Sequence, residues 1–290
     1  MSASLGTVAA QSGLTQVDGE PAPGVALRAE GLVKRFGAAV ALAGVSFEVA
    51  PGEVFGLAGA NGAGKTTLLK VLAGLCRPDE GWAEVAGADV ATEPVRVRQL
   101  VGYMPDRFGV YESMTAGEYL SFYASCYRLP RQHAERAVTD LLALMGLAAK
   151  RDEQLNALSQ GMKQRLCLAR ALVHDPEVLL LDEPAAGLDP RARAELRELV
   201  AALGEMGKAV VISSQILAEL AEVSTSIGIL HEGVMVASGN AEQLLAGSEG
   251  LEELFLSLTE REDPEGPAGP TTGGLAGEGT GEDEEGAATK

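Results

Sequence analysis

Three stretches of the chain carry continuous apolar runs, and two others alternate between apolar and polar positions. The continuous runs are residues 53–59 (EVFGLAG), 178–184 (VLLLDEP) and 209–214 (AVVISS). Strands that are buried on both faces of a parallel sheet have this pattern, so we predict three buried parallel strands. The alternating stretches, 25–37 and 45–52, predict antiparallel strands with one face in water.

A hairpin and several helices are predicted around these strands. Residues 227–239 (IGILHEGVMVASG) predict two strands that turn at residues 231–233. Thr115 and Glu118 have the spacing of a capping box and predict the start of a helix. Leucine and valine at helical spacing in 195–207 predict another helix, which stops at the glycine that ends this stretch.

The domain organisation follows from where these patterns begin and end. The stretch 112–150 is mostly helical in pattern, and we interpret it as part of a helical lobe, about 107–158, inserted into an α/β core. Residues 1–24 are small and polar, and residues 261–290 are rich in Gly, Pro, Thr and Glu, so both are predicted to be disordered. The folded domain is therefore predicted to span 25–260.

Composition narrows the class of protein. The formal net charge of −18 argues against a nucleic-acid partner, because phosphate-binding surfaces are basic. Residues 261–290 form an acidic tail with eight acidic and two basic residues, and the remainder is also acidic. The three cysteines include no CxxC pair, which favours reduced thiols in a cytosol. No apolar stretch approaches the ~20 residues that cross a bilayer, so the chain is predicted to be soluble or bound to a membrane through a partner.

A phosphate-binding loop follows the first continuous strand. The sequence GANGAGKTT fits G-x-x-x-x-G-K-[ST] between a predicted strand and a predicted helix, which is the context that this motif requires. Its glycines let backbone N–H groups surround phosphate oxygens, while the lysine reaches the β- and γ-phosphates and the first threonine offers a hydroxyl to Mg²⁺. The predicted nucleotide-binding residues are Gly59, Asn61, Gly62, Ala63, Gly64, Lys65, Thr66 and Thr67.

Two acidic residues end the second continuous strand. We predict that Asp182 binds Mg²⁺, directly or through water, and that Glu183 is the general base or positions the water for in-line attack on the γ-phosphate. An acidic pair alone is also typical of a solvated strand end, but the phosphate loop favours the catalytic interpretation. The predicted fold class is therefore α/β: a P-loop NTPase core with an antiparallel β subdomain and an inserted helical lobe.

A third motif, LSQGMKQRLCLARAL at 158–172, ends ten residues before Asp182. With the phosphate loop and the acidic pair, this order of motifs over about 27–245 resembles the ATPase subunit of ATP-binding cassette (ABC) transporters. The resemblance implies ATP and Mg²⁺ as cofactors and a dimer that holds two ATP molecules between its copies. The single phosphate loop then requires a second copy or a homologous ATPase subunit.

The resemblance also assigns roles to further residues. Ser159 and Gly161 match the family's signature loop, which contacts the γ-phosphate of ATP held by the opposite subunit, although Gln160 replaces a glycine there. Phe36 matches the aromatic residue that stacks on adenine, and Asp189 matches a residue that crosses the dimer interface. From the residues alone, Ser159 is an ordinary helix cap and Phe36 is a core residue.

Two positions depart from the family pattern. Asp106 stands where the family has a glutamine that binds Mg²⁺ and the attacking water, so the resemblance implies a metal-binding carboxylate; the alternative is a turn cap. Gln215 stands where the family has a catalytic histidine that contacts the γ-phosphate. A glutamine still donates a hydrogen bond, but it cannot become cationic or carry a proton. The histidines at 133, 174 and 231 are interpreted as surface or capping residues.

The function that the resemblance implies is ATP hydrolysis that drives an ABC transporter, most like an exporter of the ABC-2 type. The rate can be low because of Asp106 and Gln215. The partner is then a multi-span membrane permease that holds the chain on the cytoplasmic face of the cell membrane. A non-transport ABC-type ATPase and a regulatory subunit with weak hydrolysis stay open. A group of aromatic residues in the lobe is either a docking surface or lobe core: Tyr111, Tyr119, Phe122, Tyr123 and Tyr127.

Overall fold

The computed structural model of the chain describes residues 24–106, 109 and 113–246. Residues 1–23 and the predicted acidic tail lie outside the described residues, as does Tyr111. The domain boundaries and the two predictions of disorder therefore stay predictions.

The first sheet is antiparallel and contains the two alternating stretches of the sequence. Its order is β2-β1-β4-β5, and its strands are β1 (Leu27–Phe36), β2 (Ala39–Val49), β4 (Glu80–Val85) and β5 (Ala88–Asp89). Leu27 of β1 lies opposite Val49 of β2 and Val85 of β4, and all three side chains are buried. Because side chains of a strand alternate between faces, this register directs one face of the sheet into the core, as the alternation predicts.

The second sheet holds the three continuous apolar runs at its centre. Its order is β10-β9-β3-β8-β7-β6, with β3 (Val54–Ala58), β6 (Val101–Met104), β7 (Val178–Leu181), β8 (Ala209–Ser214), β9 (Ser226–His231) and β10 (Val234–Asn240). Strands β9, β3, β8, β7 and β6 are parallel, and β10 closes the edge as an antiparallel hairpin with β9. Every residue of β3, β7 and β8 is buried, so the three predicted strands are confirmed.

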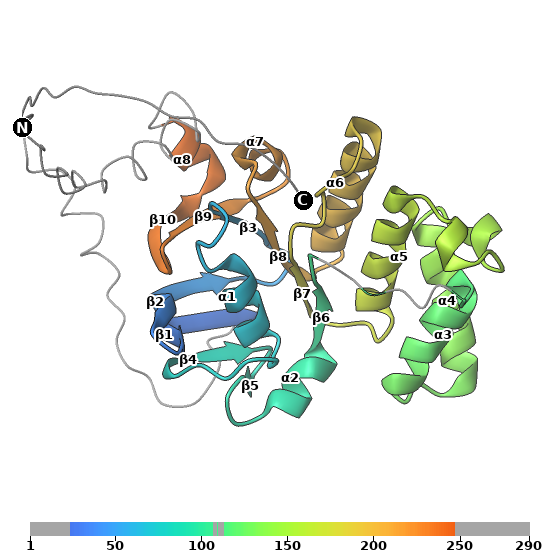
Figure 1. Cartoon of the computed structure of the whole chain (residues 1–290), viewed down its shortest axis with the longest axis horizontal. Helices are drawn as coiled ribbons and strands as arrows, with labels where there is room; N and C mark the ends of the chain where they lie inside the picture. The colour runs from blue at the N-terminus through green and yellow to red at the C-terminus, as the bar shows by residue number, and fades with distance from the viewer. Residues whose placement is uncertain (1–23, 107–108, 110–112, 247–290) are drawn as a thin grey trace, which may run out of the picture.

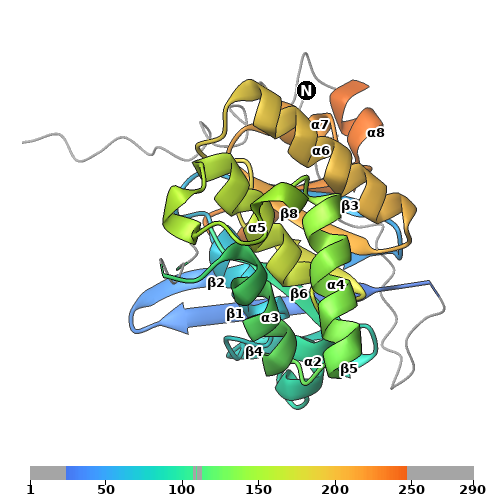
Figure 2. The same cartoon turned by 90° about the vertical axis from the view of Figure 1, so that its right-hand side faces the viewer.

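Helices cover this sheet and build the predicted lobe. They are α1 (Lys65–Leu72), α2 (Pro94–Leu100), α3 (Ala116–Cys126), α4 (Arg131–Leu144), α5 (Gln160–Leu172), α6 (Pro190–Glu205), α7 (Leu217–Ala221) and α8 (Ala241–Ala246), with 3-10 turns η1 (Ala148–Lys150) and η2 (Leu155–Ala157). Thr115 caps α3 in the predicted capping box, and Gly207 follows the end of α6 with φ 88°. Helices α3 and α4 stand beside α5, on the side away from the antiparallel sheet (Figure 1), and the same three helices lie in front of the sheets in Figure 2.

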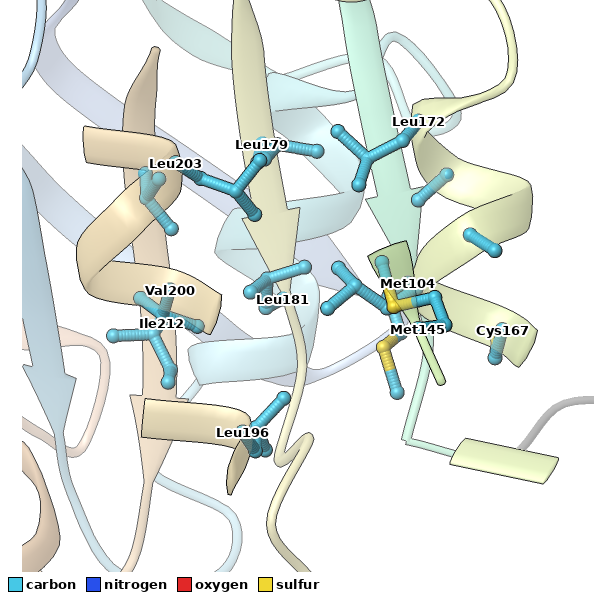
Figure 3. Close-up of a cluster of buried hydrophobic side chains, with 14 of the residues drawn as sticks. Met104, Met145, Cys167, Leu172, Leu179, Leu181, Leu196, Val200, Leu203 and Ile212 are labelled. Carbon is cyan, nitrogen blue, oxygen red and sulfur yellow. The ribbon is translucent and has the colours of Figure 1, made fainter. Parts of the chain in front are cut away.

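The main apolar core fixes the helices against the parallel strands (Figure 3). It joins β6, β7 and β8 to α5 and α6 through side chains that are at most 6% exposed: Met104, Cys167, Leu172, Leu179, Leu181, Leu196, Val200, Leu203 and Ile212. Burial of such surface contributes roughly 25 cal/mol per Å² of apolar area. Helices α5 and α6 therefore hold β7 and β8 from one face of the sheet, and the alternate residues Leu180 and Val211 belong to a second buried cluster on the opposite face.

A tight turn between β9 and β10 connects the two sheets. Glu232 and Gly233 occupy left-handed conformations, with φ 46° and 80°, at the predicted hairpin turn. The N–H of Gly233 donates to the carbonyl of Ala63 at 2.9 Å, and its carbonyl accepts from the N–H of Ala43 at 2.8 Å. A Cβ at Gly233 would lie 2.9 Å from a backbone oxygen of β2, so only glycine fits this close approach.

The lobe aromatics divide between core and surface. Tyr119 is fully buried, and its ring contacts that of Tyr123 at 5.0 Å between centroids. Phe122 is 41% exposed. The structure thus assigns Tyr119 to the lobe core and places Phe122 at the lobe surface.

The interpretation of His174 as a surface or capping residue is wrong. Its ring is half-buried and stacks on Tyr127, with centroids 3.7 Å apart and an angle of 6° between planes. Its Nε2 lies 3.1 Å from the carbonyl oxygen of Val101, so it joins α5 to α3 and β6. Burial lowers the pKa of His174 to about 4, and the ring is therefore neutral at pH 7.

Candidate nucleotide-binding site

The phosphate loop runs from the end of β3 to the start of α1. Gly62 and Gly64 have φ of 85° and 107°, a region that side chains disfavour. A Cβ at Gly64 would lie 2.5 Å from the carbonyl oxygen of Ala41, and one at Gly59 would lie 2.5 Å from that of Leu230. The glycines therefore serve two needs, which are the turn itself and its close packing against β2 and β9.

Lys65 is the first residue of α1 and is only 6% exposed. Its ammonium donates to the carbonyl oxygens of Gly59 at 2.7 Å and Ala60 at 3.2 Å. The same Nζ lies 3.1 Å from Oε1 of Glu183 in an ion pair. The loop carbonyls thus hold the lysine charge inside the curve of the loop, where a phosphate oxygen would meet it.

The two acidic residues after β7 are linked by a serine that sequence reasoning missed. The hydroxyl of Ser213, in β8, donates to Oδ1 of Asp182 at 2.9 Å and accepts from the N–H of Glu183, also at 2.9 Å. Ser213 and Asp182 are both fully buried. The sequence signal that could have identified Ser213 is the two-residue period of a strand, which places Ser213 on the same side as Gln215.

The environment of Asp182 fits a metal ligand. Burial raises the pKa of this carboxyl, the hydroxyls of Thr66 and Ser213 oppose the shift, and the nearby carboxylates of Asp106 and Glu183 add to it. Its Oδ2 is buried and makes no hydrogen bond within the described part of the chain. No cluster of three His, Cys, Asp or Glu suited to a metal occurs among the described residues. One carboxylate and one hydroxyl are nevertheless enough for Mg²⁺, which takes its other ligands from phosphates and water.

A cavity of about 230 Å³ collects most of the predicted site residues. It brings Asp106 from the end of β6, Glu183 from the end of β7 and Gln215 from the end of β8 to the phosphate loop. The carboxyl ends of parallel strands are where α/β proteins place ligands. The remaining lining residues are Ala41, Ala60, Asn61, Gly62, Gly64, Lys65, Thr66 and Thr67.

The predicted signature residues lie in a different hollow, of about 490 Å³, together with Asp189. Ser159 caps α5 by accepting the N–H of Met162 at 3.3 Å. Asp189 caps α6 by accepting the N–H of Ala192 at 2.9 Å. Gly161 belongs to the same hollow, so two helix N-termini meet there, and this hollow shares no lining residue with the first cavity.

Phe36 lies at the end of β1 and lines neither hollow. Its side chain is 55% exposed, and the Nζ of Lys34 lies 5.4 Å from the ring centroid. The alternative that Phe36 is a core residue is therefore wrong. An exposed ring at a strand end offers a face for a base to stack on.

A second residue that sequence reasoning missed is Gln164, in α5. It is 3% exposed, and its Nε2 donates to the carbonyl oxygen of Pro184 at 2.6 Å. The bond joins the helix that Ser159 caps to the loop that follows Glu183. No local sequence pattern predicts this hydrogen bond, because the two residues are 20 positions apart.

Comparison with known proteins identifies the family. Residues 42–186 match the family model described as "ABC transporter". The linearmycin resistance ATP-binding protein LnrL of Bacillus subtilis is 35% identical over 218 residues, which are 75% of this chain and 70% of LnrL. The chain belongs to the ABC transporter family. As an ABC ATP-binding protein, it belongs to a family that binds ATP and has ATPase activity.

Other relatives and solved structures agree with this assignment. An ABC transporter ATP-binding protein of Synechocystis sp. is 40% identical over 210 residues, 72% of this chain, and the chain spans 59% of that relative's length. The Nod factor export ATP-binding protein I of Burkholderia pseudomallei is 38% identical, over 76% of this chain and 72% of that protein. A solved ATP-binding subunit of an ABC transporter is 32% identical with a TM-score of 0.73, covering 80% of this ABC protein and 99% of that structure.

A further solved member of the family is described in a nucleotide-related state. An ATP-binding cassette in its ADP conformation is 25% identical with a TM-score of 0.71, over 80% of this chain and 98% of that one. The predicted fold class, an α/β P-loop core with an antiparallel sheet and a helical lobe, is thus confirmed. Among the described residues of this ABC protein, no helix is both long enough and apolar enough to span a bilayer.

Proposed function

We propose that this protein is the ATP-hydrolysing subunit of an ABC exporter, which works as a dimer on the cytoplasmic face of a membrane through a separate permease. The observation that supports this most directly is the cavity where Lys65, Thr66, Asp106, Glu183 and Gln215 meet. Exporter function is supported by the names of two relatives, a resistance protein and an export protein.

The reaction starts from the ion pair between Lys65 and Glu183. A triphosphate that enters the loop competes for the Lys65 ammonium, because phosphate carries more charge than one carboxylate. Its binding releases the Glu183 carboxylate, which is then free to accept the proton of a water placed in line with the γ-phosphate. Glu183 is half-buried, which protects it from competing solvent.

Thr66, Asp106 and Asp182 are the residues that would hold Mg²⁺ in this protein. The ion, when bound, neutralises charge on the β- and γ-phosphates. The buried Oδ2 of Asp182 and the Thr66 hydroxyl provide oxygen donors of the kind that Mg²⁺ prefers. Asp106, which is exposed at the cavity wall, adds a second negative charge where the family has a neutral amide.

The second half of each site would come from another copy or a homologous subunit. Ser159 and Gly161 present the N-terminus of α5 to the solvent, where the helix dipole favours an anion. Phe36 would stack on the adenine, and Asp189 would lie at the interface between copies. No nucleic acid is expected as a partner, since the net charge is −18.

Hydrolysis is expected to be slow rather than absent. Gln215 can donate a hydrogen bond to the γ-phosphate or to water but cannot become cationic as the family's histidine can. Asp106 cannot donate a hydrogen bond to the attacking water. Lys65, Asp182 and Glu183 are all retained, and these are the groups on which turnover depends most.

The test is to isolate the chain from membranes with its co-purifying multi-span protein and to measure MgATP turnover against a Glu183→Gln variant. Turnover well above that variant supports the proposal. Tight MgATP binding with turnover equal to that of Glu183→Gln would favour a regulatory subunit instead. Absence of any multi-span partner from the purified complex would favour a non-transport ATPase.

A further inference from the structure

Ser213 is a buried polar residue that follows an apolar run in β8. It is the fifth residue of β8, its exposed fraction is 0%, and residues 209–212 before it are all apolar and buried. A hydroxyl buried in this way is costly unless it is hydrogen-bonded. Here it uses one donor and one acceptor function, toward Asp182 and Glu183.

The bond to Asp182 fixes which carboxylate oxygen is free. The backbone N–H of Asp182 donates to the carbonyl of Met104 at 2.8 Å, so β6 holds its main chain. Ser213 then occupies Oδ1 and leaves the buried Oδ2 without a hydrogen bond in the described structure. The side chain cannot rotate without breaking the Ser213 bond, so the free oxygen keeps one direction.

The bond to Glu183 supports an unusual backbone conformation. Glu183 has φ 49°, in the left-handed region that residues other than glycine rarely adopt. Its N–H is held by Ser213, and the carbonyl of the next residue, Pro184, is held by Gln164. Strain of this kind persists only where the surroundings over-determine it.

We propose that Ser213 is a positioning residue, whose single hydroxyl sets the metal-facing oxygen of Asp182 and the backbone of Glu183 relative to one another. The inference rests on the proposed function, because it assigns Asp182 and Glu183 the metal-binding and catalytic roles. What the inference adds is that one side chain of β8 aligns both the Asp182 carboxylate and the Glu183 backbone at the end of β7. Ser213 contacts no reacting atom and acts only through the two acids.

The test compares Ser213→Ala with Ser224→Ala. Ser224 is also buried, at 9% exposed, but its hydroxyl has no hydrogen-bond partner in the described structure, and it lines no part of the nucleotide cavity. Ser213→Ala is expected to lower kcat by about 10- to 100-fold, the usual loss when a group supporting a metal ligand is removed, with KM for ATP nearly unchanged. Ser224→Ala is expected to leave kcat unchanged. Ser213→Cys, with a weaker donor and acceptor, should fall between.

A second readout does not depend on turnover. Hydrogen exchange of the Glu183 amide, measured in the nucleotide-free protein, should accelerate in Ser213→Ala and stay as in the parent in Ser224→Ala. A parent protein whose turnover equals that of Glu183→Gln would overturn the proposed function. The hydrogen-exchange measurement would still show whether Ser213 holds the backbone of Glu183. Full kcat in Ser213→Ala, or an unchanged Glu183 amide, would overturn the inference and leave the proposed function standing.

Discussion

The two hollows of this protein are built in opposite ways. The phosphate-loop cavity draws on the ends of three parallel strands and on the loop before α1, and the buried Lys65 is one of its lining residues. The hollow around Ser159 and Asp189 is lined mainly by two helix N-termini and their caps. The phosphate-loop cavity thus lies at the ends of buried strands, whereas the Ser159 hollow lies at the N-terminal ends of α5 and α6.

The difference shows what each can do alone. The phosphate-loop cavity holds the Lys65 ammonium, the carboxylates of Asp106 and Glu183 and a glycine-rich loop, which together can bind the Mg²⁺ complex of a triphosphate within one chain. The Ser159 hollow offers a hydroxyl, backbone N–H groups and a helix dipole, which can complete a phosphate site, but the phosphate loop and Lys65 are not among its lining residues. In the proposed dimer the two hollows are complementary halves of one site, so variants in the two hollows should lose different steps of the reaction.

The largest effect is expected from Lys65→Ala. Loss of the buried ammonium should abolish MgATP binding and reduce turnover by more than about 100-fold, since it removes a charge aimed at the transferring phosphate. Isothermal titration calorimetry measures MgATP binding, and a phosphate-release assay measures turnover. Lys70→Ala, an exposed lysine of the same helix, is the matched control. Retained MgATP binding in Lys65→Ala would contradict the assignment of this cavity.

Ser159→Arg should separate the two halves. A bulky side chain at the N-terminus of α5 should leave MgATP binding intact but lower turnover about 10- to 100-fold, because a preorganised phosphate donor is lost. Mixing this variant with Lys65→Ala is the decisive control. Each mixed dimer then contains one intact pair of halves, so the mixture should have a higher turnover than either variant alone. No gain on mixing would mean that the two hollows do not meet across copies.

Phe36→Ala should change affinity and leave chemistry intact. Stacking of a base on an aromatic ring contributes about 1–3 kcal/mol, so KM for ATP should rise roughly tenfold with kcat unchanged. Phe122→Ala removes a ring of comparable exposure from the helical lobe and should not change ATP affinity. Equal KM values for the parent and Phe36→Ala would show that the adenine does not stack on Phe36.

Gln215→His should have the smallest effect of the four. The ring restores the donor that the family uses, so turnover should stay the same or rise by a few-fold, measured with saturating MgATP. A fall to the level of Glu183→Gln would show that the amide has a role that histidine cannot perform. In that case the site would be adapted to Asp106 and Gln215 together rather than weakened by them.

Features that depend on neighbouring residues could be predicted from the sequence. The phosphate loop is contained in nine residues, and the helix caps at Thr115 and Ser159 need only the next three or four positions. The buried strands follow from continuous apolar runs. These signals also place Asp182 and Glu183 at a strand end, since the run VLLL stops there.

Features that depend on register could not be predicted. The bond from Ser213 to Asp182 spans 31 positions and exists because Leu181 of β7 pairs with Ile212 of β8. An apolar run tolerates a shift of one residue along its neighbour, and such a shift would turn the Ser213 hydroxyl away. The stacking of His174 on Tyr127 is similar, because it depends on how α5 packs against α3.

The turn at Gly233 has a consequence for motion. Its N–H and carbonyl join the phosphate loop at Ala63 to β2 at Ala43, so the antiparallel sheet and the loop are connected through a single residue. We expect them to rotate as one rigid body, with Phe36 at the strand end carried along. Any relative movement that accompanies a catalytic cycle is then expected at other contacts: where α5 packs against β6, or between two copies of the chain.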